Sequence, residues 1–138
     1  MLKSKLIHPE ILHALGGAGH GSKILIADGN YPFSTGSNPE ADKVFLNLAQ
    51  GIVKVPQVLE VLTESVEVEE AGVMTPGPQS EEPPIFNQFR KLLSREELIK
   101  HGRFEFYEQA RKKNVALTIA TGETRTYANI LLTIGVVH

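Results

Sequence analysis

The clearest candidate for proton chemistry in this chain is a histidine set among glycines. His20 is flanked by Gly19 and Gly21, and glycines allow backbone angles that can present an imidazole at the mouth of a pocket. An imidazole titrates near neutral pH, so such a histidine can both give and take a proton. The same pattern is also typical of a glycine turn that carries an exposed histidine, so spacing alone leaves both interpretations open.

A second candidate is Asp28, which directly follows residues 23–27 (Lys-Ile-Leu-Ile-Ala). This short, continuous apolar run is bounded by turn formers and predicts a buried strand. Open α/β sheets gather ligands at the carboxyl ends of such strands. An Asx turn or a helix cap formed with Gly29 and Asn30 is the structural alternative, and it is compatible with a functional role.

Other site chemistries lack their sequence patterns. The glycines within residues 16–21 precede the predicted strand instead of following it, so they do not form a dinucleotide-binding turn. No Gly-Lys-Ser/Thr phosphate loop and no Gly-x-Ser-x-Gly nucleophile motif occurs. The histidines form no i, i+4 pair, and the chain has no cysteine. We therefore expect no metal site and no thiol nucleophile.

The elements that must position these side chains alternate between helices and strands. Apolar periodicity predicts helices at residues 9–15, 55–62 and 85–93, a charged helical segment at about 95–100, and a helix around 106–110. Strands are predicted at residues 23–27, 43–48, 66–69, 115–120 and 130–132, with a turn at 121–124 and a proline-rich surface loop at 75–84. This alternation indicates α/β layers.

Composition narrows the class of protein further. The chain has 138 residues, 41% of them hydrophobic and 22% charged, which suits one globular domain and leaves little room for a separate cofactor domain. A formal charge of -2 without a cluster of five or six like charges removes the usual electrostatic basis for binding nucleic acid or an anionic membrane. No signal peptide or membrane span is evident, so we expect a cytoplasmic protein.

Two further motifs have ordinary structural explanations when each is taken alone. Residues 103–108 (Arg-Phe-Glu-Phe-Tyr-Glu) indicate a helix with an aromatic core face, and Tyr127 near Asn129 indicates strand packing. In combination and in order, however, several segments resemble the sugar mutarotase family that includes L-fucose mutarotase and D-ribose pyranase. The segments are residues 19–21, 26–32, 103–108, 121–123 and 127–129.

The resemblance spans nearly the whole chain and is weakest between about residues 66 and 100. It is closer to the L-fucose branch, because Arg103 stands where ribose pyranases tend to carry histidine. Three positions depart from the usual family pattern. Ser22 follows Gly-His-Gly where an acidic residue is common, Ala128 replaces the glycine of Tyr-Gly-Asn, and Tyr31 replaces a phenylalanine.

The resemblance implies a single three-layer α/β domain over residues 1–138, with a central, mostly parallel or mixed sheet and helices on both faces. It implies an isomerase that interconverts the anomers of a free monosaccharide, most simply L-fucose, with neither a metal nor an organic cofactor. It also implies a ring-shaped homo-oligomer, a decamer or octamer, with sites near subunit contacts.

Residue roles follow from the same resemblance. His20 would be the catalytic acid/base, Tyr127 a partner acid, and Asp28 the group that orients a sugar hydroxyl or the imidazole. The sugar-binding positions would be Asp28, Arg103, Tyr127, Ala128 and Asn129. Two alternatives stay open: conversion between pyranose and furanose forms of D-ribose, and a non-catalytic sugar-binding subunit, which the departures at Ser22 and Ala128 allow.

Overall fold

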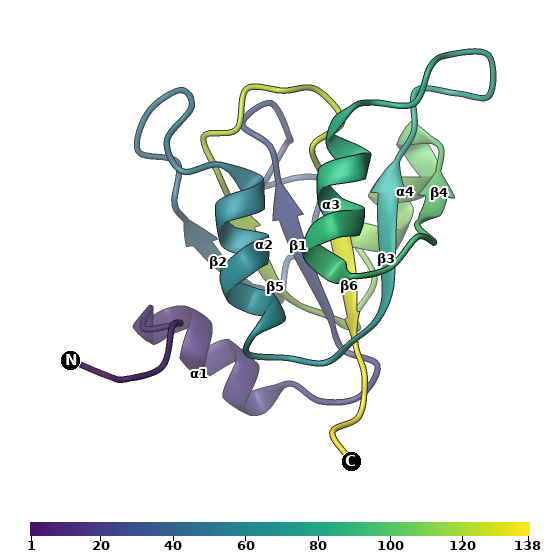
Figure 1. The fold of residues 1–138 in the computed structure, drawn as a ribbon. Coiled ribbons are helices and arrows are strands. Elements are labelled where there is room, and N and C mark those ends of the chain that lie inside the picture. Colours follow the sequence, from purple (N-terminus) through teal and green to yellow (C-terminus); the bar gives the residue numbers. More distant parts are fainter.

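A six-stranded sheet with the strand order β2-β5-β1-β6-β3-β4 forms the centre of the computed structural model, which describes residues 1–138 (Figure 1). The strands are β1 (Lys23–Ala27), β2 (Asp42–Phe45), β3 (Val68–Met74), β4 (Ile99–His101), β5 (Val115–Ala120) and β6 (Ile130–Ile134). The helices are α1 (Pro9–Gly17), α2 (Val55–Thr63), α3 (Ile85–Leu93) and α4 (Arg103–Ala110).

The sheet is mixed, with a single reversed strand. β1, β2 and β5 pair in parallel, as do β3 and β4, whereas β6 runs antiparallel to both β1 and β3. The carboxyl ends of five strands therefore lie at one edge of the sheet, where β6 begins. Because β1 lies between β5 and β6, the segment that joins them, residues 121–129, has to cross the carboxyl end of β1.

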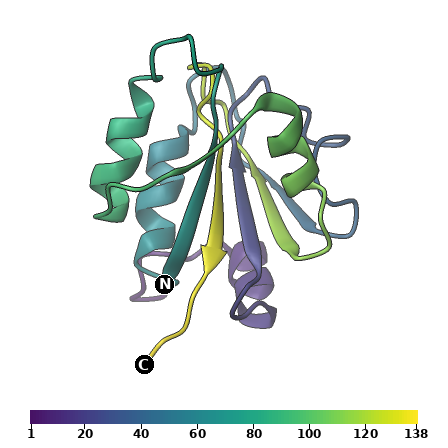
Figure 2. The same cartoon turned by 90° about the vertical axis from the view of Figure 1, so that its right-hand side faces the viewer.

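Alternate side chains of β1 enter two different cores, as the strand period of two requires. Ile24 and Ile26 belong to the larger core with residues of α1, α2 and α3. Leu25 and Ala27 belong to the smaller one with Phe106 and Ala110 of α4. Figure 2 shows α2 and α3 on one face of the sheet and α4 on the other, which confirms the three-layer α/β fold. None of the helices is long and apolar enough to cross a membrane.

Most predicted elements are present, and several differ at their boundaries. The strand predicted at 43–48 is shorter, and the one predicted at 66–69 begins at Val68 and continues to Met74. The alternating Val and Glu residues mark only the exposed entry of β3, since its buried part begins at Ala71. Ala and Gly have low strand propensity, so their burial in the sheet was not evident from local pattern.

The prediction of a charged helix at residues 95–100 is wrong. Ser94 adopts a left-handed backbone with φ of 52°, which ends α3, and the Arg95 N–H then bonds the Arg90 carbonyl. Ile99–His101 instead forms β4, the edge strand beside β3. Pairing with β3 therefore decides the structure of Ile99–His101, and the charged pattern of residues 95–100 does not.

Thr118 of β5 allows a test of how a buried polar group without a partner affects the stability of the core. Its side chain is 1% exposed, and its hydroxyl has no hydrogen-bond partner. We expect Thr118→Val to raise the free energy of unfolding by about 1 kcal/mol in urea titrations, because it removes an unsatisfied buried polar group. Thr121 is the matched control: its buried hydroxyl donates to the Ala27 carbonyl at 2.8 Å, so Thr121→Val should lower that free energy. Equal effects of both changes would contradict this view.

Candidate functional site

Segments that are distant in the sequence converge at the carboxyl edge of the sheet. Residues 28–31 follow β1, residues 126–129 precede β6, Met74 ends β3, and α4 begins close by. Together they line a cavity of about 240 Å³. The lining residues are Asp28, Asn30, Tyr31, Met74, Arg103, Tyr107, Thr126, Tyr127 and Asn129.

Asp28 lies deep in this cavity and is 3% exposed. Its carboxylate accepts the Asn30 N–H at 2.9 Å, which forms the Asx turn considered above, and it also bonds the Ala128 N–H and the Asn129 side chain. Burial raises the pKa of the Asp28 carboxyl, and these hydrogen bonds lower the pKa without offsetting the effect of burial. Asp28 is therefore both an anchor for residues 128–129 and a carboxyl whose charged form is disfavoured.

Asn129 and Tyr127 are held beside Asp28 by the backbone. The Asp28 N–H donates to Asn129 Oδ1 at 2.7 Å. Tyr127 has a φ of 58°, a left-handed conformation that is uncommon for a bulky residue and marks a locally constrained backbone. The structure thus brings Asp28, Tyr127 and Asn129 into one cavity.

Two of the departures from the family pattern have structural explanations. Ala128 is fully buried, and its methyl group packs in the larger core. Its contribution to the site is therefore the backbone N–H that bonds Asp28. The Tyr31 hydroxyl donates to the Gly36 carbonyl, so the extra oxygen is satisfied within its own loop.

Arg103 and Tyr107 supply the α4 wall of the cavity. They lie four residues apart, hence on one helix face, and Arg103 Nε donates to the Tyr107 hydroxyl at 3.4 Å. The guanidinium carbon lies 5.5 Å and 5.8 Å from the ring centroids of Phe104 and Tyr107. Tyr107 was missed as a site residue because its motif was interpreted as a core face; its spacing from Arg103 was the available signal.

His20 is not brought to this cavity within one chain. It precedes the amino end of β1, whereas Asp28 follows the carboxyl end. The five residues of β1 alone span about 16 Å at roughly 3.3 Å each. His20 is exposed, with Nε2 3.0 Å from Glu69 Oε1, in a turn where Ser22 Oγ accepts the Gly19 N–H. Within the single chain, His20 is therefore an exposed histidine in a glycine turn.

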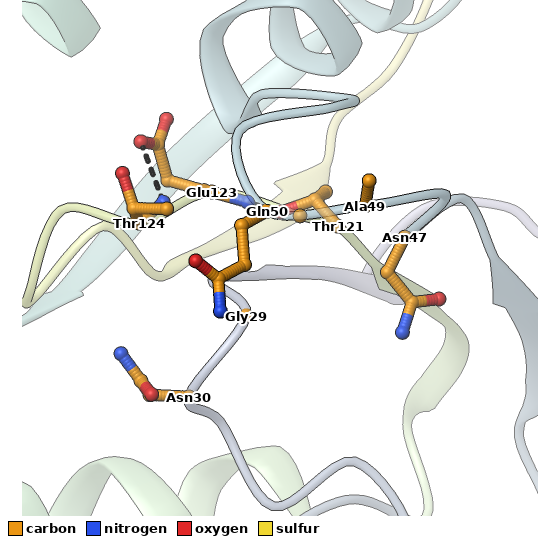
Figure 3. Close-up of a pocket in the computed structure, with 9 residues that line it drawn as sticks. Gly29, Asn30, Asn47, Ala49, Gln50, Thr121, Glu123 and Thr124 are labelled. Carbon is orange, nitrogen blue, oxygen red and sulfur yellow. Dashed lines mark hydrogen bonds between the residues drawn. The ribbon is translucent and has the colours of Figure 1, made fainter.

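A second, polar cavity of about 490 Å³ is lined in part by Gly29 and Asn30 (Figure 3). Its remaining lining residues are Asn47, Ala49, Gln50, Thr121, Gly122, Glu123 and Thr124. Asn30 lines both cavities, so the two cavities adjoin at the loop after β1. No three His, Asp or Glu side chains lie close enough to hold a metal ion.

Comparison with known proteins identifies the family of this chain. Residues 1–137 match the RbsD / FucU transport protein family. The chain belongs to this family. Among RbsD / FucU relatives, the fucose mutarotase of Mus musculus is 36% identical over 141 residues, covering 93% of this chain and 88% of the mouse protein. The D-ribose pyranase of Staphylococcus haemolyticus is 32% identical over 137 residues, covering 99% of both chains.

Solved RbsD / FucU structures share the fold. Bacillus subtilis RbsD complexed with D-ribose superposes with a TM-score of 0.85 at 27% identity, over 100% of both chains. The fucose mutarotase of Streptococcus pneumoniae in complex with L-fucose gives 0.84 at 26% identity, also over 100% of both. The family resemblance seen in the motifs and the α/β fold are both confirmed.

The raised pKa of Asp28 predicts how pH affects the stability of this RbsD / FucU protein. The unfolded chain loses the proton near the ordinary value of 3.8 and the folded chain at a higher pH, so folded protein holds more protons between the two. The free energy of unfolding should therefore fall as pH rises through that window. Asp28→Asn removes this pH-dependent contribution to the free energy of unfolding. Urea titrations between about pH 4 and pH 7 should show wild type losing stability relative to the variant; parallel curves would contradict the prediction.

Proposed function

We propose that this protein is a monosaccharide mutarotase that interconverts the anomers of free L-fucose. The observation that carries the proposal is the single cavity shared by Asp28, Arg103, Tyr127 and Asn129 in a member of the RbsD / FucU family. Fixed hydrogen-bonding groups around a cavity of this kind suit a polyhydroxyl ligand. The identity to fucose mutarotases of mouse and human, 36% and 34%, supports L-fucose.

The reaction needs two proton transfers and no redox step. A proton leaves the C1 hydroxyl, another reaches the ring oxygen, and the C1 to ring-oxygen bond breaks to give the open aldehyde. Rotation about the C1 to C2 bond and reclosure on the other face of the carbonyl return both protons. The uncatalysed reaction already runs in water, so positioned acid and base groups, worth roughly 10²- to 10⁴-fold, can be sufficient.

In this scheme Tyr127 gives or takes one proton, and Asp28 orients the reacting hydroxyl. Arg103 and Asn129 hold other hydroxyls. Asn129 is buried, so a sugar without the hydroxyl that pairs with Asn129 leaves a buried donor unpaired, at about 1 to 3 kcal/mol, which gives the cavity selectivity.

The second proton is assigned to His20 of a neighbouring copy. One chain keeps His20 and Asp28 at opposite edges of the sheet, so a shared site needs two different surfaces in contact. Such a head-to-tail contact repeats around a closed ring, in keeping with a decamer or octamer. Exposed Phe104, beside Arg103, and exposed Leu48 are apolar side chains that fit a subunit contact. We place this assembly in the cytoplasm.

Two alternatives have specific support. A D-ribose pyranase of the same length is 32% identical, so conversion of ribopyranose to ribofuranose is the first. The second alternative is a protein that binds sugar without turning it over, and it is supported by the separation of His20 from the cavity within one chain.

Proton NMR saturation transfer tests all three on the wild-type protein. L-fucose should exchange between its anomers faster than in buffer and faster than D-ribose at equal concentration. Faster exchange of D-ribose would favour the pyranase. Binding of L-fucose in calorimetry, without faster exchange, would reject the mutarotase and support the binding protein. Light scattering gives the oligomer size.

A further inference from the structure

Glu123 is a buried carboxylate outside the sugar cavity that the mechanism above does not use. It is 1% exposed and lies in the segment that crosses from β5 to β6. Arg125 binds both carboxylate oxygens, with Nε at 3.0 Å and Nη2 at 2.9 Å. The N–H groups of Thr124 and Arg125 also donate to it, at 3.1 Å and 3.2 Å, and the first of these bonds is drawn in Figure 3.

The backbone N–H of Val55, in the first turn of α2, also favours the charged form of this carboxylate and lowers its pKa. Burial acts to raise the pKa of Glu123, but the hydrogen bonds and charge of Arg125 outweigh it and hold the pKa below its ordinary value. With both oxygens engaged and the charge neutralised, Glu123 has no free capacity to bind a sugar. Its role must therefore be carried out through the residues it holds.

Those residues fasten the crossing segment to three neighbours. The Gly29 N–H, next to Asp28, donates to the Glu123 carbonyl at 2.8 Å. Arg125 Nη1 donates to Gln88 Oε1 on α3 at 3.2 Å. Gly122 leaves no space for a side chain, because a Cβ there would meet the carbonyl oxygens of Ala49 and Ile52.

Two residues after Arg125, the backbone enters the left-handed conformation of Tyr127. A bulky residue in this conformation would relax to a commoner backbone conformation unless the segments before and after it were held in place. The bond between the Asp28 N–H and Asn129 fixes the downstream flank, and the Glu123–Arg125 pair fixes the upstream one.

From this arrangement we infer that Glu123, through Arg125, is a positioning residue that fixes Tyr127 and Asn129 for the sugar. The expected effect on catalysis rests on the proposed function, whereas the expected effect on the position of Tyr127 and Asn129 does not. A displacement of about 1 Å in a group that transfers a proton can cost up to about 10²-fold in rate. Loss of the Glu123 charge should therefore lower kcat more than it changes KM.

Glu123→Gln tests this, with Glu82→Gln as the matched control. Glu82 also receives two guanidinium hydrogen bonds, from Arg90, but in the loop before α3 and away from the cavity lining. At a temperature where circular dichroism shows both variants folded, Glu123→Gln should lower kcat for L-fucose exchange at least about tenfold. Glu82→Gln should keep kcat and KM within about twofold of wild type, as a remote surface pair would.

Amide hydrogen exchange of the peptide that spans residues 124–129 gives a readout independent of activity. It should become faster in Glu123→Gln and stay unchanged in Glu82→Gln. If Glu123→Gln does not fold, Arg125→Gln is measured in its place, with the same expected direction. Unchanged exchange of this peptide, or a kcat within twofold of wild type, overturns the inference. A wild type without sugar turnover refutes the proposed function alone, and the hydrogen exchange result then decides the positioning role.

Discussion

A protein with His20 replaced by alanine should fold and still bind L-fucose but lose roughly 10²- to 10⁴-fold of its anomer exchange. The fold should survive because His20 is exposed and its imidazole contacts the Glu69 carboxylate at the surface, outside both cores. Binding should persist because the cavity residues around Asp28 come from other segments. Saturation transfer NMR measures the exchange, and calorimetry measures the binding.

His13→Ala is the matched control. His13 is an exposed histidine on α1, a few residues before His20 and outside the cavity lining. It should exchange L-fucose at the wild-type rate. If His20→Ala also exchanges at that rate, the proton-transfer role assigned to His20 is wrong.

Mixing two inactive variants should restore activity. When His20→Ala and Asp28→Asn chains are unfolded together in equal amounts and reassembled, about a quarter of the shared sites receive an intact His20 and an intact Asp28 from different chains. Exchange should therefore recover to about a quarter of the wild-type rate. The reason is that β1 separates the two side chains within each chain, so each site draws them from separate copies.

A second mixture separates shared sites from sites made by one chain. An equal mixture of wild type and the double variant His20→Ala/Asp28→Asn, reassembled together, should show about a quarter of the rate of pure wild type at the same total protein concentration if sites are shared, and about half if each chain carries its own site. Recovery near half, or no recovery when the two single variants are mixed, would place the whole site in one chain. Each variant reassembled alone serves as the baseline.

Local pattern predicted the elements whose burial follows a simple period. The apolar run at residues 23–27 is β1, and the spacing of Val55, Val58, Leu59 and Leu62 is that of α2. The proline-rich loop at 75–84 has no helix or strand. These segments carry their fold signal within a few neighbouring residues, so pattern is sufficient for them.

Pattern failed where a pairing partner decided the structure. Residues 95–100 form a charged stretch that predicts a helix, yet residues 99–101 form β4 because β3 offers an edge to pair with. The buried part of β3, residues 71–74, is also recognisable only from its neighbours β6 and β4. Long-range backbone hydrogen bonds stabilise such strands whatever their local preference.

The candidate site divides in the same way. The sequence by itself determined the α/β class, the family, and the motifs that hold Asp28, Arg103, Tyr127 and Asn129. Only the tertiary structure decided that these four share a cavity, that Tyr107 joins them, and that Glu123 lies outside this cavity in an ion pair with Arg125. It also decided that His20 stands at the far edge of the sheet, since the direction of β1 separates two residues that lie close together in sequence.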